Sequence, residues 1–157
     1  MLKVIGIGNI LRGDDGIGPA IIRHLENKFS PELIQLYDAG SDAFAVLDHL
    51  IQPQPVIVID CAQMGSRPGT IQVVTVRDSD YIDKNLGISL HGVSLAEIWQ
   101  MARSMGETPA LTVIGIEPKK IAFNSDLSEE VKNSIPAAVK IIVEEAKKYA
   151  QEDSHHR

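Results

Sequence analysis

The chain has 157 residues, and 15 Lys and Arg against 21 Asp and Glu give a formal net charge of −6. This length predicts one domain over residues 1–150, followed by a polar, frayed C-terminal tail over 151–157. The acidic balance argues against nucleic-acid binding, and the single cysteine excludes a disulfide framework and a cysteine-based zinc or iron–sulfur site. Because no apolar run approaches the about 20 residues of a membrane span and the N-terminus lacks a secretory signal, we expect a cytoplasmic protein without membrane contact.

Five short runs rich in β-branched residues predict strands. In chain order they are Leu2–Ile7, Leu33–Tyr37, Pro55–Ile59, Thr70–Val76 and Ala110–Ile116. The third run is apolar on both faces, which is typical of a central strand covered on both sides. The fourth run partly alternates between apolar and polar residues, so we expect it near an edge of the sheet.

Four amphipathic stretches predict helices between and after these strands. They are Gly18–Phe29, Ser41–Ile51, a helix opened by the capping box of Ser94 and Glu97, and a last helix over about 128–150. The stripes expected to be buried include Phe44, Ile51 and Met105. Pro136 falls inside the last helix and is expected to kink or split it.

The alternation of strands and helices predicts an α/β fold: a single three-layer α/β/α domain with a mostly parallel, twisted sheet of about five strands. In such sheets ligands bind beyond the carboxyl ends of the strands. Asp15, Asp38 and Asp60 come at the ends of three successive strands. Each has a structural alternative, since Asp often caps helices and turns, and Asp14 in particular suits a turn or cap. Together, beside flanking glycines, the three predict a site at this edge.

His91 is the histidine best placed to join that site. It precedes the helix that opens near Ser94, and a helix N-terminus favours the neutral imidazole that binds metals. His24 and His49 fall within predicted helices and are expected to be structural, and the two histidines of the tail are expected to be solvated. Carboxylates and a neutral imidazole form a donor set suited to a divalent ion with open coordination positions.

The spacing of these donors also excludes other chemistry. They are spread along the chain and lack the local spacing of a preformed zinc site, which favours weak contact with a metal that the substrate brings. No Gly-x-Ser-x-Gly segment is present, and Cys61 at the end of a buried strand is expected to be a packing residue. The segment Gly6-Ile7-Gly8 lacks the third glycine of a dinucleotide fingerprint, and the nearby acids would repel a pyrophosphate.

Several sequence blocks carry a family resemblance. They are the run from Gly6 to Pro19 (GIGNILRGDDGIGP), Asp38-Ala39-Gly40-Ser41, the run from Ile59 to Gly65, Pro68-Gly69-Thr70-Ile71, His91 and Gly115-Ile116-Glu117-Pro118. Over roughly residues 3–146 the chain resembles the nickel–iron hydrogenase maturation endopeptidases. The Gly13-Asp14-Asp15 and Met64-Gly65 details are most similar to the formate-hydrogenlyase and archaeal type. Ala39 and Pro136 depart from the family's pattern.

The resemblance implies an activity and a partner. The protein would be an endopeptidase, aspartic-type in the family's naming, which removes a short C-terminal extension from the nickel-loaded precursor of the hydrogenase large subunit. Asp15, Asp60 and His91 would be the catalytic residues and would contact the nickel, and Asp38 would support them. The nickel would be carried by the precursor, with no tightly bound cofactor, and the protease would be a monomer.

Two other functions remain as alternatives to this one. A non-catalytic metal-delivery or assembly module would use the same donors, bind metal tightly by itself and release no peptide. An ordinary metallo-aminopeptidase would cleave free small peptides. The three functions therefore differ in which substrates they cleave, if any.

Overall fold

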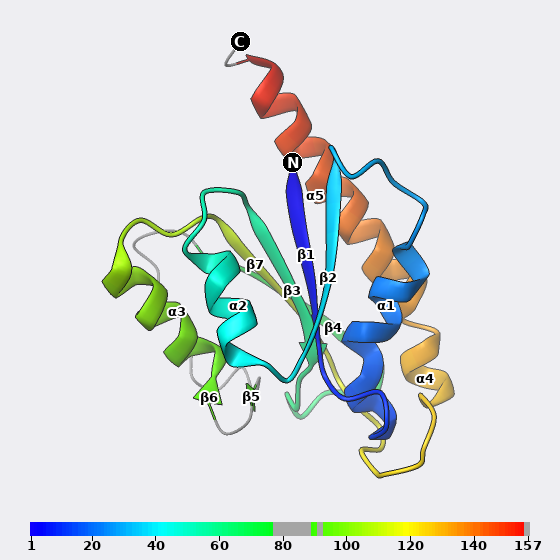
Figure 1. The fold of residues 1–157 in the computed structure, drawn as a ribbon. Coiled ribbons are helices and arrows are strands. Elements are labelled where there is room, and N and C mark those ends of the chain that lie inside the picture. Colours follow the sequence, from blue (N-terminus) through cyan, green and yellow to red (C-terminus); the bar gives the residue numbers. More distant parts are fainter. Residues whose placement is uncertain (77–88, 91–92, 156–157) are drawn as a thin grey trace.

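The computed structural model describes residues 1–76, 89–90 and 93–155, and it has the α/β architecture that the sequence predicts (Figure 1). Five strands form one sheet in the order β2-β1-β3-β7-β4. They are β1 (Leu2–Ile7), β2 (Ile34–Gly40), β3 (Val56–Cys61), β4 (Ile71–Val76) and β7 (Leu111–Ile116). β4 pairs antiparallel to β7, whereas the other neighbours are parallel. The predicted central position of the third run and edge position of the fourth are confirmed.

Helices connect and follow these strands. They are the 3₁₀ helix η1 (Gly13–Gly16), α1 (Ile17–Leu25), α2 (Ala43–Leu50), α3 (Leu95–Met105), α4 (Glu129–Lys132) and α5 (Ile135–His155). Two short strands, β5 (Ser89–Leu90) and β6 (Val93–Ser94), pair antiparallel ahead of α3. The predicted capping box is present on α3, where Ser94 Oγ accepts from the Glu97 amide and Glu97 Oε2 accepts from the Ser94 amide. Within the described part of the chain, no helix has the length and apolar character needed to cross a membrane.

The last predicted helix is split, as Pro136 suggested. Pro136 lies in the first turn of α5, where backbone amides have no partner within the helix, so the missing N–H of proline costs no hydrogen bond. α4 ends before Pro136, at Lys132. The prediction of a frayed tail is wrong over residues 151–155, because α5 continues to His155. Three apolar side chains expected in the core are exposed: Phe44 (75%), Met105 (61%) and Ile51 (40%). Each lies within a turn of a helix end, where the apolar stripe no longer faces the sheet.

The sheet separates two apolar cores. α2 and α3 cover one face, and α1, α4 and α5 cover the other (Figure 1). Successive residues of β3 alternate between them, so that Val58 packs with α2 and α3 while Ile57 and Ile59 pack with α1 and α5. Covering on both faces explains why β1, β3 and β7 are buried along their whole length.

The order of the strands creates a switch point. After β1 the chain forms β2 at one edge of the sheet and then returns past β1 to form β3. The strands β7 and β4 lie beyond β3, on the side of the sheet opposite to β2. α1 and α2, which follow β1 and β2, therefore lie on opposite faces of the sheet. The carboxyl ends of β1 and β3, at the bottom of Figure 1, form the position where open α/β sheets bind ligands.

Candidate active site

The loop after β1 carries Asp15 to this switch point. Gly8 has a φ of +135°, and a Cβ there would lie 1.8 Å from the carbonyl oxygen of Asp15, so the close approach requires glycine. The half-buried Asp15 lies in η1, and its Oδ2 accepts a hydrogen bond of 2.9 Å from the Asn9 amide. The loop is thereby closed on itself, which fixes the position of the Asp15 carboxylate.

Asp60 lies in β3, beside this loop, and is only 3% exposed. Its Oδ1 accepts a hydrogen bond of 2.7 Å from the Cys61 amide and lies 3.6 Å from the point that a Cβ on Gly8 would occupy. Burial, and after it the negative charge of Asp15, raise the pKa of Asp60 well above its usual range, although the Cys61 amide opposes the shift. Asp15, which is half-buried, and Asp60, which is buried, therefore form a pair of acids at the switch point, and we call them the acid pair.

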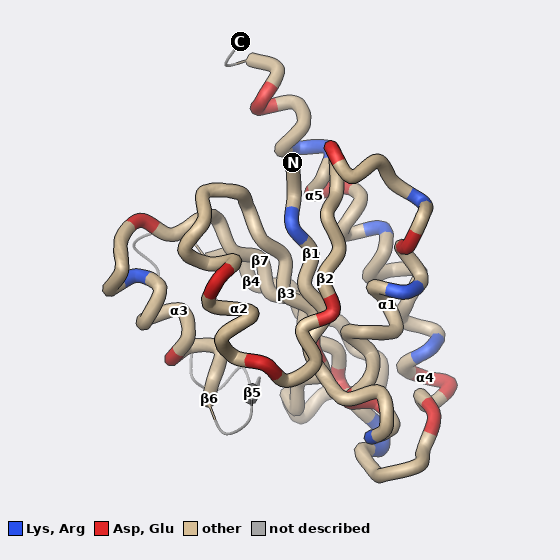
Figure 2. The backbone as a smooth tube through the Cα atoms, viewed as in Figure 1, with Lys and Arg blue, Asp and Glu red and all other residues tan. Residues whose placement is uncertain are grey.

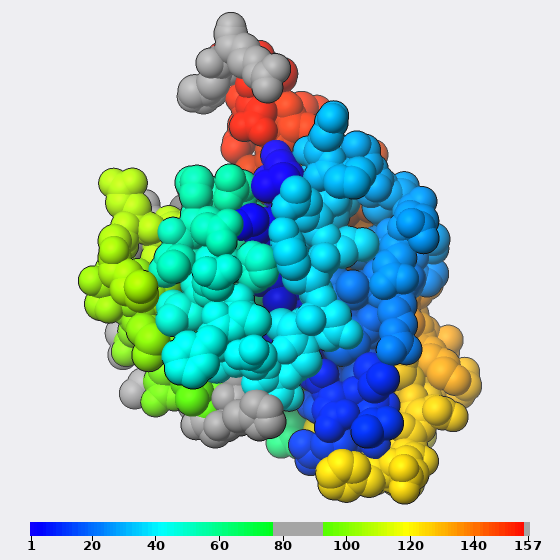
Figure 3. Space-filling view, in the orientation of Figure 1, coloured from blue at the N-terminus to red at the C-terminus, as the bar shows by residue number. Residues whose placement is uncertain are grey.

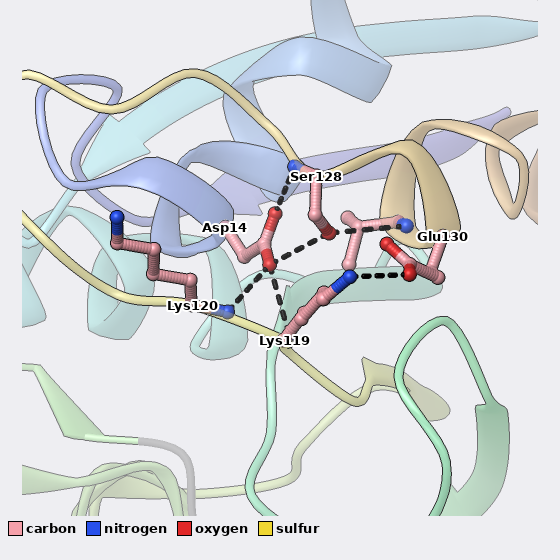
Figure 4. Close-up of polar contacts among 6 residues, drawn as sticks. Asp14, Lys119, Lys120, Ser128 and Glu130 are labelled. Atoms are coloured by element: carbon pink, nitrogen blue, oxygen red, sulfur yellow. Dashed lines mark hydrogen bonds and ion pairs between the residues drawn. The ribbon is translucent and has the colours of Figure 1, made fainter.

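Asp14, the residue before Asp15, is fully buried but has the opposite environment (Figure 4). Its Oδ2 accepts from the amides of Lys119 (2.8 Å) and Lys120 (2.9 Å) and from the Ser128 hydroxyl (2.9 Å), and its Oδ1 accepts from the Ser128 amide (2.7 Å). Burial raises the pKa of Asp14, but these four hydrogen bonds outweigh it and hold the pKa below its usual value. Asp14 is structural, as the alternative interpretation predicts, and it anchors residues 119–128 to the first loop.

Glu117 is a further acid at this edge, and the sequence analysis gave it no role. It directly follows β7, is 8% exposed, and accepts a hydrogen bond of 2.6 Å from the Met64 amide. Its own amide donates to the carbonyl of Thr70, and its carbonyl accepts from the amide of Gly69. An acid directly after a buried strand is the signal that identified the other acids, and the same signal would have found Glu117. Its hydrogen bonds hold the segment after β3 against the end of β7.

The pKa of the Cys61 thiol is raised by its burial and by four nearby acids. Cys61 is buried, and burial first, then the charges of Asp60 and Asp15, and more weakly those of Asp14 and Glu117, raise the pKa of its thiol. A thiol with a raised pKa stays protonated and is a poor nucleophile, so its predicted role in packing is confirmed. Figure 2 shows acidic positions, in red, gathered at the lower edge where the parallel strands end.

Asp38 and His91 are the other two residues that the sequence predicts for the site. The strand that carries Asp38 runs three residues further than predicted, so Asp38 lies within β2 instead of after it. Its exposed side chain accepts a hydrogen bond of 3.0 Å from the Gly40 amide, which is the loop-supporting bond expected of it as a structural residue. His91 lies outside the described residues, and its predicted role stays a prediction.

Among the residues that the structure describes, no three His, Cys, Asp or Glu side chains form a group that could hold a metal ion. The acid pair supplies two carboxylates whose negative charges repel each other in a buried position. A divalent cation would relieve that repulsion, and it would need further ligands from elsewhere.

The fold and the site together define a small open-sheet α/β protein with the acid pair at its switch point. A family model described as hydrogenase maturation protease matches residues 19–145. The chain therefore belongs to the hydrogenase maturation protease family, whose members are endopeptidases, and the resemblance in its motifs is confirmed. The narrower likeness to the formate-hydrogenlyase and archaeal type stays a prediction.

Individual relatives agree with this assignment. A putative hydrogenase maturation protease from Methanocaldococcus jannaschii is 31% identical, and the match covers 94% of this chain and 97% of the relative. The crystal structure of a hydrogenase 2 maturation peptidase from a Thaumarchaeota archaeon superposes with a TM-score of 0.69 at 30% identity, over 91% of this chain and 95% of that one. An endopeptidase from Escherichia coli gives a TM-score of 0.77 at 25% identity, over 95% and 93%.

Proposed function

We propose that this protein is an endopeptidase that removes a short C-terminal extension from the nickel-loaded large-subunit precursor of a nickel–iron hydrogenase. The observation that carries the proposal is the acid pair at the switch point, where burial and the charge of Asp15 raise the pKa of Asp60. The names of the relatives, hydrogenase maturation protease and peptidase, support this class of substrate. The protein acts as a cytoplasmic monomer, and the precursor is its partner.

The nickel belongs to the substrate in this proposal. Asp15, Asp60 and His91 contact the nickel that the precursor already holds, and Asp38 supports the neighbouring loop through its bond to the Gly40 amide. Two neighbouring carboxylates of like charge, one buried and one half-buried, bind a proton or a cation more readily than they stay charged together. The approach of nickel stabilises their charged forms, so the loaded precursor is bound in preference to the nickel-free one. The protein needs no tightly bound cofactor of its own.

Hydrolysis of the peptide bond requires a base for the attacking water and a donor for the leaving amine. With both carboxylates in contact with the nickel, one of them also accepts the proton of the water. The water oxygen bonds to the carbonyl carbon, the carbon–nitrogen bond breaks, and the same proton passes to the amine of the released extension. Burial strengthens each of these charge interactions, because water is excluded from around Asp60.

The proposal is tested by incubating the purified protein with nickel-loaded and nickel-free precursor and detecting the C-terminal peptide by mass spectrometry. Release from the loaded form alone is expected. His91→Ala is expected to leave the fold intact, by circular dichroism, and to prevent release. Absence of peptide from either form would favour the metal-delivery module, and hydrolysis of free small peptides would favour the aminopeptidase.

A further inference from the structure

An exposed apolar tip lies beside the candidate active site. It consists of Ile10 (47% exposed), Leu11 (61%) and Phe123 (70%), from the loop after β1 and the loop after β7. In Figures 1 and 3 these blue and yellow segments lie side by side at the bottom of the molecule. Single exposed apolar side chains are ordinary on a protein surface, but three of them gathered from distant parts of the chain indicate a contact surface.

Backbone and side-chain contacts join the two loops of this apolar tip. The amide of Asn124 donates to the carbonyl of Leu11 (3.0 Å), and the amide of Gly13 donates to the carbonyl of Ser125 (3.1 Å). The guanidinium of Arg12 lies 5.5 Å from the centroid of the Phe123 ring. The tip is therefore held in place before any partner binds, which lowers the entropy cost of binding. Aromatic residues and Arg are also enriched at protein interfaces.

The apolar tip is continuous with the acid pair through the first loop. The Asn9 amide donates to Asp15 Oδ2, and Asn9 Oδ1 accepts from the Leu11 amide (2.9 Å). Ile10 and Leu11 thus directly follow the residue that holds the Asp15 carboxylate. On the other side, the four hydrogen bonds of Asp14 fix the segment that leads to Phe123. A protein whose peptide bond reaches Asp15 therefore approaches the loop that carries Ile10 and Leu11.

We propose that the apolar tip docks on an apolar surface of the large-subunit precursor next to its cleavage site and thereby contributes to substrate affinity. The inference rests on the proposed function, because the occupant is the protein that the acid pair cleaves. The tip binds and does not react, so its loss raises KM and leaves kcat unchanged. The apolar tip also predicts that folded precursor is cleaved in preference to short peptides, since a peptide cut to the cleavage site lacks the apolar surface.

The test compares Leu11→Ser and Phe123→Ser with Met105→Ser. Met105 is 61% exposed, as Leu11 is, but lies at the last residue of α3, away from the acid pair. KM is measured from release of the C-terminal peptide, and Kd from binding of nickel-loaded precursor to the immobilised protein. We expect each tip variant to raise both about tenfold and to keep the wild-type kcat at saturating precursor, whereas Met105→Ser matches the wild type.

Three outcomes would overturn the docking surface. In the first, the wild type releases the peptide but both tip variants keep the wild-type KM and Kd. The proposed function is then supported, and the apolar tip is not a docking surface. In the second, KM is unchanged and sedimentation shows that the variants have lost a self-association of the wild type, so the tip binds a second copy. In the third, the wild type neither binds nor cleaves the precursor, and the proposed function fails together with the surface. Thermal melting of both tip variants verifies that each is folded.

Discussion

Asp14 and Asp60 are two buried carboxylates at the same edge of the same sheet, and they behave in opposite ways. Asp14 accepts four hydrogen bonds, and its pKa lies below the usual value. Asp60 accepts the Cys61 amide and faces the charge of Asp15, and its pKa lies well above the usual value. Burial alone therefore does not identify a functional acid. An acid with a full set of donors stabilises the fold, whereas an acid opposed by a like charge is prepared for a proton or a cation.

The largest effects are expected for substitutions in the acid pair, of which Asp15→Asn is one. Removing one charge of the acid pair should lower the rate of release from nickel-loaded precursor at least about 100-fold, the loss typical of a missing acid or base. The melting temperature should stay close to that of the wild type, because Asn keeps an oxygen that can accept from the Asn9 amide. Asp38→Asn is the matched control, since Asn keeps the oxygen that accepts from the Gly40 amide, so the supporting bond is preserved and the variant should retain activity. An active Asp15→Asn would remove this residue from the site.

Asp14→Asn should have the largest effect on stability. The side-chain amide would place a donor where the carboxylate accepts, so bonds to the Lys119, Lys120 or Ser128 groups must break. We expect a loss of about 3 kcal/mol, seen as a fall in melting temperature of about 6–12 °C. Asp42→Asn is the control, because Asp42 caps α2 and Asn caps a helix equally well. A wild-type melting temperature for Asp14→Asn would show that the anchor is unimportant.

Ser128→Ala should weaken the same anchor by a smaller amount. The substitution removes the hydroxyl that donates to Asp14 and that accepts from the Val131 amide as the cap of α4. The Ser128 amide still donates to Asp14 Oδ1, so the loss should be about 1–2 kcal/mol. Chemical denaturation measures it, and a loss as large as that of Asp14→Asn would contradict the assignment of four separate bonds.

The smallest effect has the opposite sign and depends on pH. Because the folded state raises the pKa of Asp60, the unfolded chain loses this proton first, and the charge costs stability as pH rises from about 4 through the raised pKa. Asp60→Asn should therefore melt like the wild type near pH 4 and about 2–4 °C higher near pH 7. Asp14 behaves in reverse, since its lowered pKa gives stability that is present above about pH 4 and lost below it. An equal change in melting temperature for Asp60→Asn at both pH values would mean that the folded state does not raise the pKa of Asp60.

The sequence predicts those parts of the molecule that local patterns determine. Alternating and continuous apolar runs identified the strands, and the position of acids at their ends identified the acid pair, because parallel strands end at one edge. Strand ends were less accurate, and β2 runs on to Gly40, which places Asp38 inside it. The four donors of Asp14 could not be predicted, because the three residues that supply them lie more than 100 positions away in the chain. Such contacts depend on how the loops after β1 and β7 meet.

The most direct test of the central claim compares peptide release by the wild type and Asp60→Asn on the same nickel-loaded precursor. The two side chains have nearly the same shape, and Asn keeps an acceptor for the Cys61 amide, so the fold should be intact and more stable at pH 7. We expect Asp60→Asn to release no C-terminal peptide under conditions in which the wild type processes the precursor completely. Processing at the wild-type rate by a folded Asp60→Asn would show that the acid pair is not the site of cleavage.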